Sequence, residues 1–182
     1  SKQWLKKIQQ ISKKDIIFIS HLLNISQFSD DEDFYFSNLP KKLLEGGYSS
    51  LTVLLNHTGV ELTDHSNREK DNLLSKLILP RTMSFLKEIQ NLKLLWIESK
   101  NLRREGRLES DNLKNNVFRM AANEALSPSS LGVMRLATQL KEIAEITNPK
   151  ILITTHEGHA WERLDYSAVR KVKPGVKCIG YT

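Results

Sequence analysis

The chain is poor in cysteine and has no long apolar run, and each shortage excludes a class of protein. A single cysteine, Cys178, among 182 residues cannot form an internal disulfide, and it rules out a cysteine-rich zinc site. A membrane-spanning helix needs roughly 20 consecutive apolar residues, far more than runs such as Ile16 to Ile19 provide. The basic residues 1–14 also lack the apolar stretch of a signal peptide. We therefore predict a cytoplasmic protein.

Familiar catalytic motifs are missing as well. There is no Walker sequence and no G-x-G-x-x-G loop, so the chain carries no standard triphosphate or dinucleotide fingerprint. The absence of a G-x-S-x-G elbow counts against a hydrolase. His156 and His159 are three residues apart, whereas the metalloprotease motif needs two histidines four apart on one helix. We therefore expect no metal site.

What the chain does have is the composition of a globular protein with an excess of positive charge. Hydrophobic residues make up 40%, charged residues 26%, and the net charge is +6. The bases cluster at 2–14 and at 100–107. Such clusters favour anionic partners, namely nucleotide-sugars, anionic lipid headgroups or nucleic acid, but they also occur on ordinary solvated helix faces. The length fits one domain over residues 1–182.

Apolar runs alternate with stretches of helical periodicity. The expected strands are 15–20, 51–56, 76–79, 151–155 and 176–181. The expected helices are 34–45, 83–104, 111–126, 128–146 and 159–172, with Gly106 as the break after the second of them. Pro40 allows the first helix to start as late as residue 38 or 39. This alternation predicts an α/β fold, a Rossmann-like parallel sheet of about five strands with helices on both faces.

Polar residues gather where the expected strands end. Ligands of open parallel sheets bind beyond the carboxyl ends of the strands, so these residues are candidates for a binding edge. The candidates are His21 after the first strand, His57 after the second, Arg81 after the third, His156, Glu157 and His159 after the fourth, and Tyr181 on the fifth. Four of the five histidines occupy such positions.

The fourth group, 156–159, is the most specific of these. Gly158 allows a tight turn, and His159 lies near the start of the following helix, where a protonated imidazole is disfavoured. Glu157 or a neutral His159 could act as a general base on a sugar hydroxyl. The same two residues could instead only cap the helix. Trp161 could be core or a stacking platform for a sugar, and Asp33 could point into the cleft.

Several of these residues together resemble a known family. Six segments are similar to the N-terminal region of bacterial surface-carbohydrate biosynthesis proteins, namely Ser20-His21, Asp33-Phe-Tyr-Phe36, Leu39-Pro40, Asn56-His57-Thr58, Glu157-Gly-His-Ala-Trp-Glu162 and Gly180-Tyr181. These are glycosyltransferase-like enzymes of capsule and O-antigen pathways. The resemblance covers residues 15–182 and is loose between 59 and 111.

The resemblance implies the acceptor-side half of a two-domain, metal-independent GT-B enzyme, with Glu157, Trp161 and Glu162 lining the cleft between the domains. It implies a nucleotide-sugar donor, bound mainly by a second domain that we expect to follow, and a glycan or lipid-linked acceptor. No other cofactor and no nucleic acid partner are expected, and the basic surface would favour peripheral contact with an anionic membrane. A non-catalytic carbohydrate- or nucleotide-binding module, or a different α/β enzyme such as an epimerase, are the alternatives.

Overall fold

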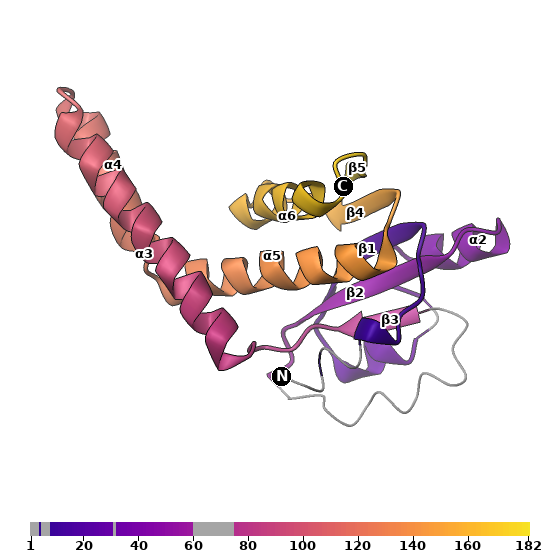
Figure 1. Ribbon diagram of the computed structural model, residues 1–182. Helices are drawn as coiled ribbons and strands as arrows, with labels where there is room; N and C mark the ends of the chain where they lie inside the picture. The colour runs from indigo at the N-terminus through magenta and orange to yellow at the C-terminus, as the bar shows by residue number, and fades with distance from the viewer. Residues whose placement is uncertain (1–3, 5–7, 31, 60–74) are drawn as a thin grey trace. The chain divides into compact units, whose positions relative to one another are not determined.

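A computed structural model describes residues 4, 8–30, 32–59 and 75–182. Within these residues the core is a sheet of five parallel strands in the order β3-β2-β1-β4-β5 (Figure 1). The strands are β1 (Ile16–Leu22), β2 (Ser50–Asn56), β3 (Ser75–Ile78), β4 (Ile151–Thr155) and β5 (Lys177–Tyr181). The helices are η1 (Ile25–Phe28), α2 (Leu39–Glu45), α3 (Phe85–Leu108), α4 (Asn112–Glu124), α5 (Pro128–Thr147) and α6 (Ala160–Val172). The predicted α/β, Rossmann-like parallel fold is confirmed.

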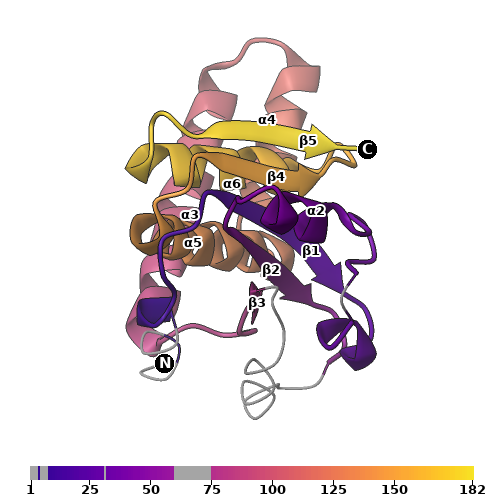
Figure 2. The same ribbon diagram turned by 90° about the vertical axis from the view of Figure 1, so that its right-hand side faces the viewer.

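The sheet is covered on both faces, which explains why its central strand is apolar almost throughout. On one face Phe18 and Ile153 pack with Phe36, next to α2. On the other face Thr154 contacts Tyr166 of α6. Figure 2 shows α2 in front of the sheet and α6 behind it. A strand buried on both faces has no solvent-facing position, so its sequence is a continuous apolar run rather than an alternating one.

The first helix begins later than Phe34. Asp33 accepts hydrogen bonds from the backbone N–H groups of Tyr35 and Phe36, at 2.9 and 3.0 Å, and this local turn competes with helix formation. The helix therefore starts at Leu39, with Pro40 in its first turn, where a missing N–H costs nothing.

The prediction that Gly106 ends a helix is wrong, because α3 continues through Gly106 to Leu108. The residue is small for a packing reason. A Cβ atom at Gly106 would lie 2.9 Å from the Cβ of Phe118 in α4, closer than atoms of this kind approach. Glycine here lets the two antiparallel helices make close contact.

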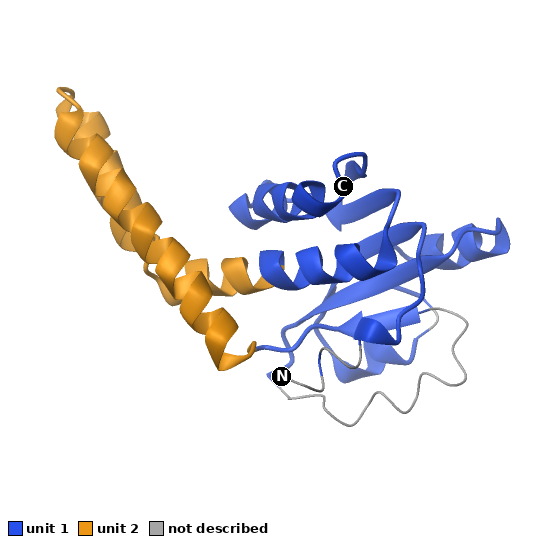
Figure 3. Cartoon of the chain, viewed as in Figure 1, with its two compact units in different colours: residues 1–81, 137–182 blue, residues 82–136 orange. Residues whose placement is uncertain are grey.

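The chain divides into two compact units (Figure 3). The sheet unit comprises residues 1–81 and 137–182, and the hairpin unit comprises residues 82–136 with α3, α4 and the start of α5. None of the described helices is both long enough and apolar enough to cross a membrane.

Candidate functional site

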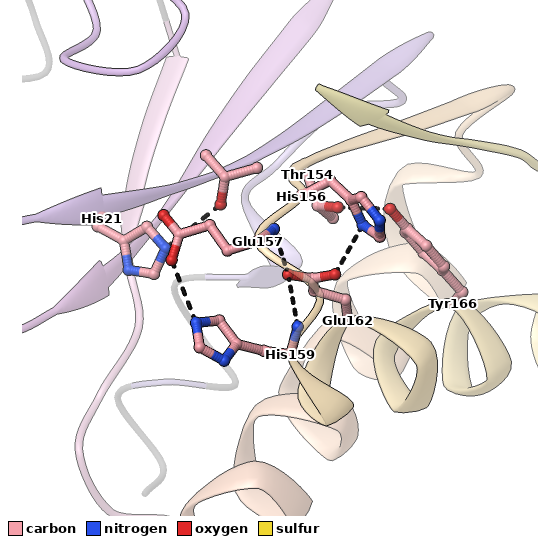
Figure 4. Close-up of polar contacts among 8 residues, drawn as sticks. His21, Thr154, His156, Glu157, His159, Glu162 and Tyr166 are labelled. Atoms are coloured by element: carbon pink, nitrogen blue, oxygen red, sulfur yellow. Dashed lines mark hydrogen bonds and ion pairs between the residues drawn. The ribbon is translucent and has the colours of Figure 1, made fainter. Parts of the chain in front are cut away.

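The candidate site lies where β1 and β4 are neighbours in the sheet. From β1 the strand order runs outward to β2 and β3, and from β4 it runs outward to β5. Crossovers therefore leave these two strands in opposite directions, and open parallel sheets bind ligands beyond the carboxyl ends of strands at such a point. His21 of β1 and Thr155 of β4 lie at this point, and the turn 156–159 follows directly after Thr155. Figure 4 shows His21 together with His156, Glu157 and His159 of this turn.

The side chain of His21 contacts residues from three other parts of the chain, at the ends of β2 and β4 and in α6. Its Nδ1 lies 2.9 Å from Nε2 of His57, and its Nε2 lies 3.4 Å from Oγ1 of Thr155. Its ring is nearly perpendicular to that of Trp161, at 82°, with ring centroids 5.9 Å apart. Burial lowers the pKa of His21, the charge of His57 lowers it further, and nearby Glu157 and Asp33 only partly oppose this. The imidazole therefore favours its neutral form.

Glu162 holds the turn between β4 and α6 in place. Its Oε1 accepts hydrogen bonds from the backbone N–H groups of Glu157 and His159, at 2.9 and 3.2 Å. Its Oε2 lies 2.7 Å from Nδ1 of His156. Burial raises the pKa of this carboxyl group, but the two backbone hydrogen bonds and His156 outweigh burial and leave the pKa below its ordinary value. Glu162 is therefore a buried carboxylate that holds the backbone of Glu157 and His159 in place.

Glu157 and His159 form an exposed pair on this fixed turn. Nε2 of His159 lies 3.1 Å from Oε2 of Glu157, and the two side chains are 57% and 51% exposed. Gly158 between them has a φ of 81°, a conformation that other residues rarely adopt. Figure 4 shows Glu157 between the rings of His21 and His159. A carboxylate and an imidazole that share a hydrogen bond and remain accessible can accept a proton from a bound hydroxyl group.

His156 sits at the contact between β4 and β5. Its backbone N–H donates to the carbonyl oxygen of Tyr181 at 2.8 Å. A Cβ atom at Gly180 would lie 2.8 Å from the Cβ of His156, so only glycine leaves room for this side chain. The ring of Tyr181 itself lies 5.3 Å from that of Phe36.

Two further candidate residues, Asp33 and Arg81, lie farther from the Glu157–His159 pair. Asp33 is buried, and its Oδ1 accepts a hydrogen bond from Oγ of Ser20 at 2.8 Å as well as from the backbone of its own turn. It thereby ties residues 33–36 to β1. Arg81 follows the edge strand β3 and donates to the carbonyl oxygen of Gly59 at 3.1 Å.

Sequence reasoning missed a third buried acid, Asp165. It lies one helical turn after Glu162, is fully buried, and neither of its carboxylate oxygens has a hydrogen-bond partner. Burial raises its pKa well above the ordinary value, and the charge of Glu162 raises it further. Two acids three residues apart on the face that also holds buried Val169 would have been the available signal.

In the part of the chain that the structure describes, no three His, Cys, Asp or Glu side chains lie close enough together to hold a metal ion.

Comparison with known proteins gives no relative: no protein-family model, no curated protein and no solved structure matches the chain.

Proposed function

We propose that the chain is the acceptor-side domain of a glycosyltransferase that acts in bacterial surface-polysaccharide synthesis. The observation that carries the proposal is the accessible Glu157–His159 pair at the switch point of the sheet. Its backbone is fixed by Glu162, so the pair is held in place before any ligand arrives. The similarity of residues 157–162 and 180–181 to surface-carbohydrate enzymes supports the same proposal.

In this proposal the Glu157–His159 pair acts as a general base. It takes the proton of an acceptor hydroxyl group while that oxygen attacks the anomeric carbon of the donor sugar. The bond from that carbon to the donor phosphate breaks, and the nucleoside diphosphate leaves with the bonding electrons. His21, held neutral next to Trp161, would orient the acceptor ring by hydrogen bonding and stacking.

The test uses the protein as it is made in its own cells, with a panel of nucleotide-sugars and a lipid extract of those cells as acceptor. Released nucleoside diphosphate is the readout. We expect Glu157→Gln to lower the rate by about 10²–10⁴-fold, the range for loss of a general base. The control is Glu98→Gln, the same substitution at an exposed position on α3, and it should leave the rate unchanged. Full transfer by a Glu157→Gln/His159→Asn variant that is folded would contradict the proposal.

A second candidate is a module that binds a carbohydrate or nucleotide without chemistry. It is favoured by the aromatic cluster around His21, whose ring centroid lies 5.2 Å from that of Tyr35 and 5.9 Å from that of Trp161. Such a cluster can stack on a sugar or base whether or not a reaction follows. The two functions separate when binding is measured by calorimetry. A module would bind the same ligands before and after Glu157→Gln, and no nucleotide-sugar would be consumed.

A further inference from the structure

Helix α3 of the hairpin unit carries a row of large apolar side chains that face solvent. Phe85, Ile89, Leu92 and Trp96 are 77%, 46%, 46% and 50% exposed. Their spacing of four, three and four residues places them on one face of the helix. Isolated exposed apolar residues are ordinary, but a contiguous row of this kind marks a surface that interacts with something.

The same face continues in the second half of α3 as a row of bases. Lys100, Arg103 and Arg107 extend the spacing of the apolar row, and Nζ of Lys100 lies 3.6 Å from the centre of the Trp96 ring. We call these seven residues the α3 outer stripe, namely Phe85, Ile89, Leu92, Trp96, Lys100, Arg103 and Arg107.

The acids of α3 lie away from this stripe. With 3.6 residues per turn, Glu98 and Glu105 fall near the opposite side of the helix. Glu88 is occupied by Arg135, with atoms 2.7 Å apart. Two of the three acids of α3 thus lie on the opposite side, and the one carboxylate beside the stripe, Glu88, is already paired with Arg135.

Packing within the hairpin uses a different face. Oγ of Ser99 donates to the carbonyl oxygen of Ala122 at 2.7 Å, and Gly106 lies against Phe118. One member of the α3 outer stripe also contacts α4, since Nη2 of Arg103 donates to Oδ1 of Asn123 at 2.6 Å. The four large apolar residues of the stripe remain 46–77% exposed.

We propose that the α3 outer stripe docks on the surface of an anionic phospholipid bilayer. A helix bound at a membrane surface lies in the plane of the interface, with apolar residues at the boundary of headgroups and acyl chains and bases on lipid phosphates. Leu86, Leu94 and Ile97 of α3 are also exposed and lie outside the stripe, so they add apolar surface beside it. Trp96 has an apolar ring with a polar N–H, the kind of side chain that settles at the headgroup level. A 24-residue helix offers about 36 Å of contact along the surface.

The charge pattern argues against two other occupants. A second copy of the chain, aligned in parallel, would place bases against bases, and in the antiparallel direction it would place bases against the apolar row. A nucleic acid would use the bases but would leave Phe85, Ile89 and Leu92 in water. An anionic bilayer can bind both the apolar and the basic half of the stripe, because it combines an apolar interior with phosphates.

The experiment is flotation of the purified full chain with vesicles, at low salt and at 0.5 M NaCl. We expect co-flotation with vesicles that contain phosphatidylglycerol, none with pure phosphatidylcholine, and release in about 0.5 M salt because charge contacts are screened. Lys100→Glu/Arg107→Glu should weaken binding by at least about tenfold. The matched control Lys41→Glu/Lys171→Glu changes the net charge equally on exposed positions of the sheet unit, and it should bind like the wild type.

Depth of insertion is read from tryptophan fluorescence. A shift to shorter wavelength on phosphatidylglycerol vesicles should disappear in Trp96→Phe. Three results would overturn the proposal: no binding to anionic vesicles at low salt, equal loss in the control variant, or a dimer in sedimentation that Ile89→Ser/Trp96→Ser dissociates. Because no step involves sugar transfer, the result is independent of the proposed enzymatic function.

Discussion

The sheet unit and the hairpin unit differ in how far their large apolar side chains are buried. In the sheet unit Phe18 and Leu152 are fully buried, while polar groups such as Glu157 show at the strand ends. In the hairpin unit Ser99 is buried and Phe85 is 77% exposed. The sheet unit is therefore held together by a core of large side chains, whereas the buried positions of α3 are Asn91, Leu95, Ser99 and Gly106, most of them small or polar. Several large apolar residues of the hairpin lie outside its packing.

The sharpest way to break this comparison is the same substitution in both units. Phe18→Ala should lower the free energy of unfolding by about 3–5 kcal/mol, because it removes a fully buried ring and leaves a cavity. Phe85→Ala should change it by no more than about 0.5 kcal/mol, because the ring is already in solvent. Urea denaturation followed by circular dichroism measures both. Similar losses for the two variants would show that Phe85 belongs to a core after all.

A second test concerns the close contact inside the hairpin. Gly106→Ala should destabilise α3 and α4 by about 1–3 kcal/mol, because the new methyl group meets Phe118. Gly132→Ala is the matched control, since a Cβ there has no neighbour within 4 Å, and it should stabilise helix α5 by up to about 1 kcal/mol. Thermal unfolding compares them. Recovery in Gly106→Ala/Phe118→Ala would confirm the contact, and equal behaviour of the two alanine variants would contradict it.

The sheet unit could be predicted from sequence because its rules are local. Each strand is a short apolar run between helical segments, and five such runs are enough to predict a parallel sheet. The exact start of the first helix, which Pro40 left open between residues 34 and 39, and the misjudged Gly106 have one cause in common. Both depend on a particular partner, the Asp33 carboxylate in one case and Phe118 in the other, and spacing does not reveal partners.

The site shows the same division. Residues 156–159 follow from their place after a strand, and the structure brings His21 and His57 to the same edge. That Glu162 is a buried anchor was open to prediction, because His159 and Glu162 have the spacing of a capping box. The buried Asp165 had a weaker signal, its place three residues after Glu162 on the face of Val169, because an acid on an amphipathic helix is expected to face water.

The smallest expected effect sharpens the polar side of the comparison. His21 should titrate below its ordinary pKa of 6.5, because burial and the charge of His57 disfavour the imidazolium. His57→Gln should raise the pKa of His21, and nuclear magnetic resonance titration of the ring protons measures it. Since the folded chain binds this proton less tightly than the unfolded chain, stability should fall as the pH drops through 6.5 towards the folded-state pKa. An unchanged His21 pKa in His57→Gln would refute the coupling.

The position of the hairpin between β3 and β4 in the sequence has a consequence for folding during synthesis. Ile16 pairs with Ile151, so two neighbouring strands of the sheet are separated by about 130 residues of chain. At about 5–20 residues per second, a ribosome needs on the order of ten seconds to make the missing neighbour. Until then β1 can pair with β2 but has one open edge and an apolar surface, the kind of segment that attracts chaperones or aggregates. Both halves of the candidate site come together only when β4 has been made and has closed that edge.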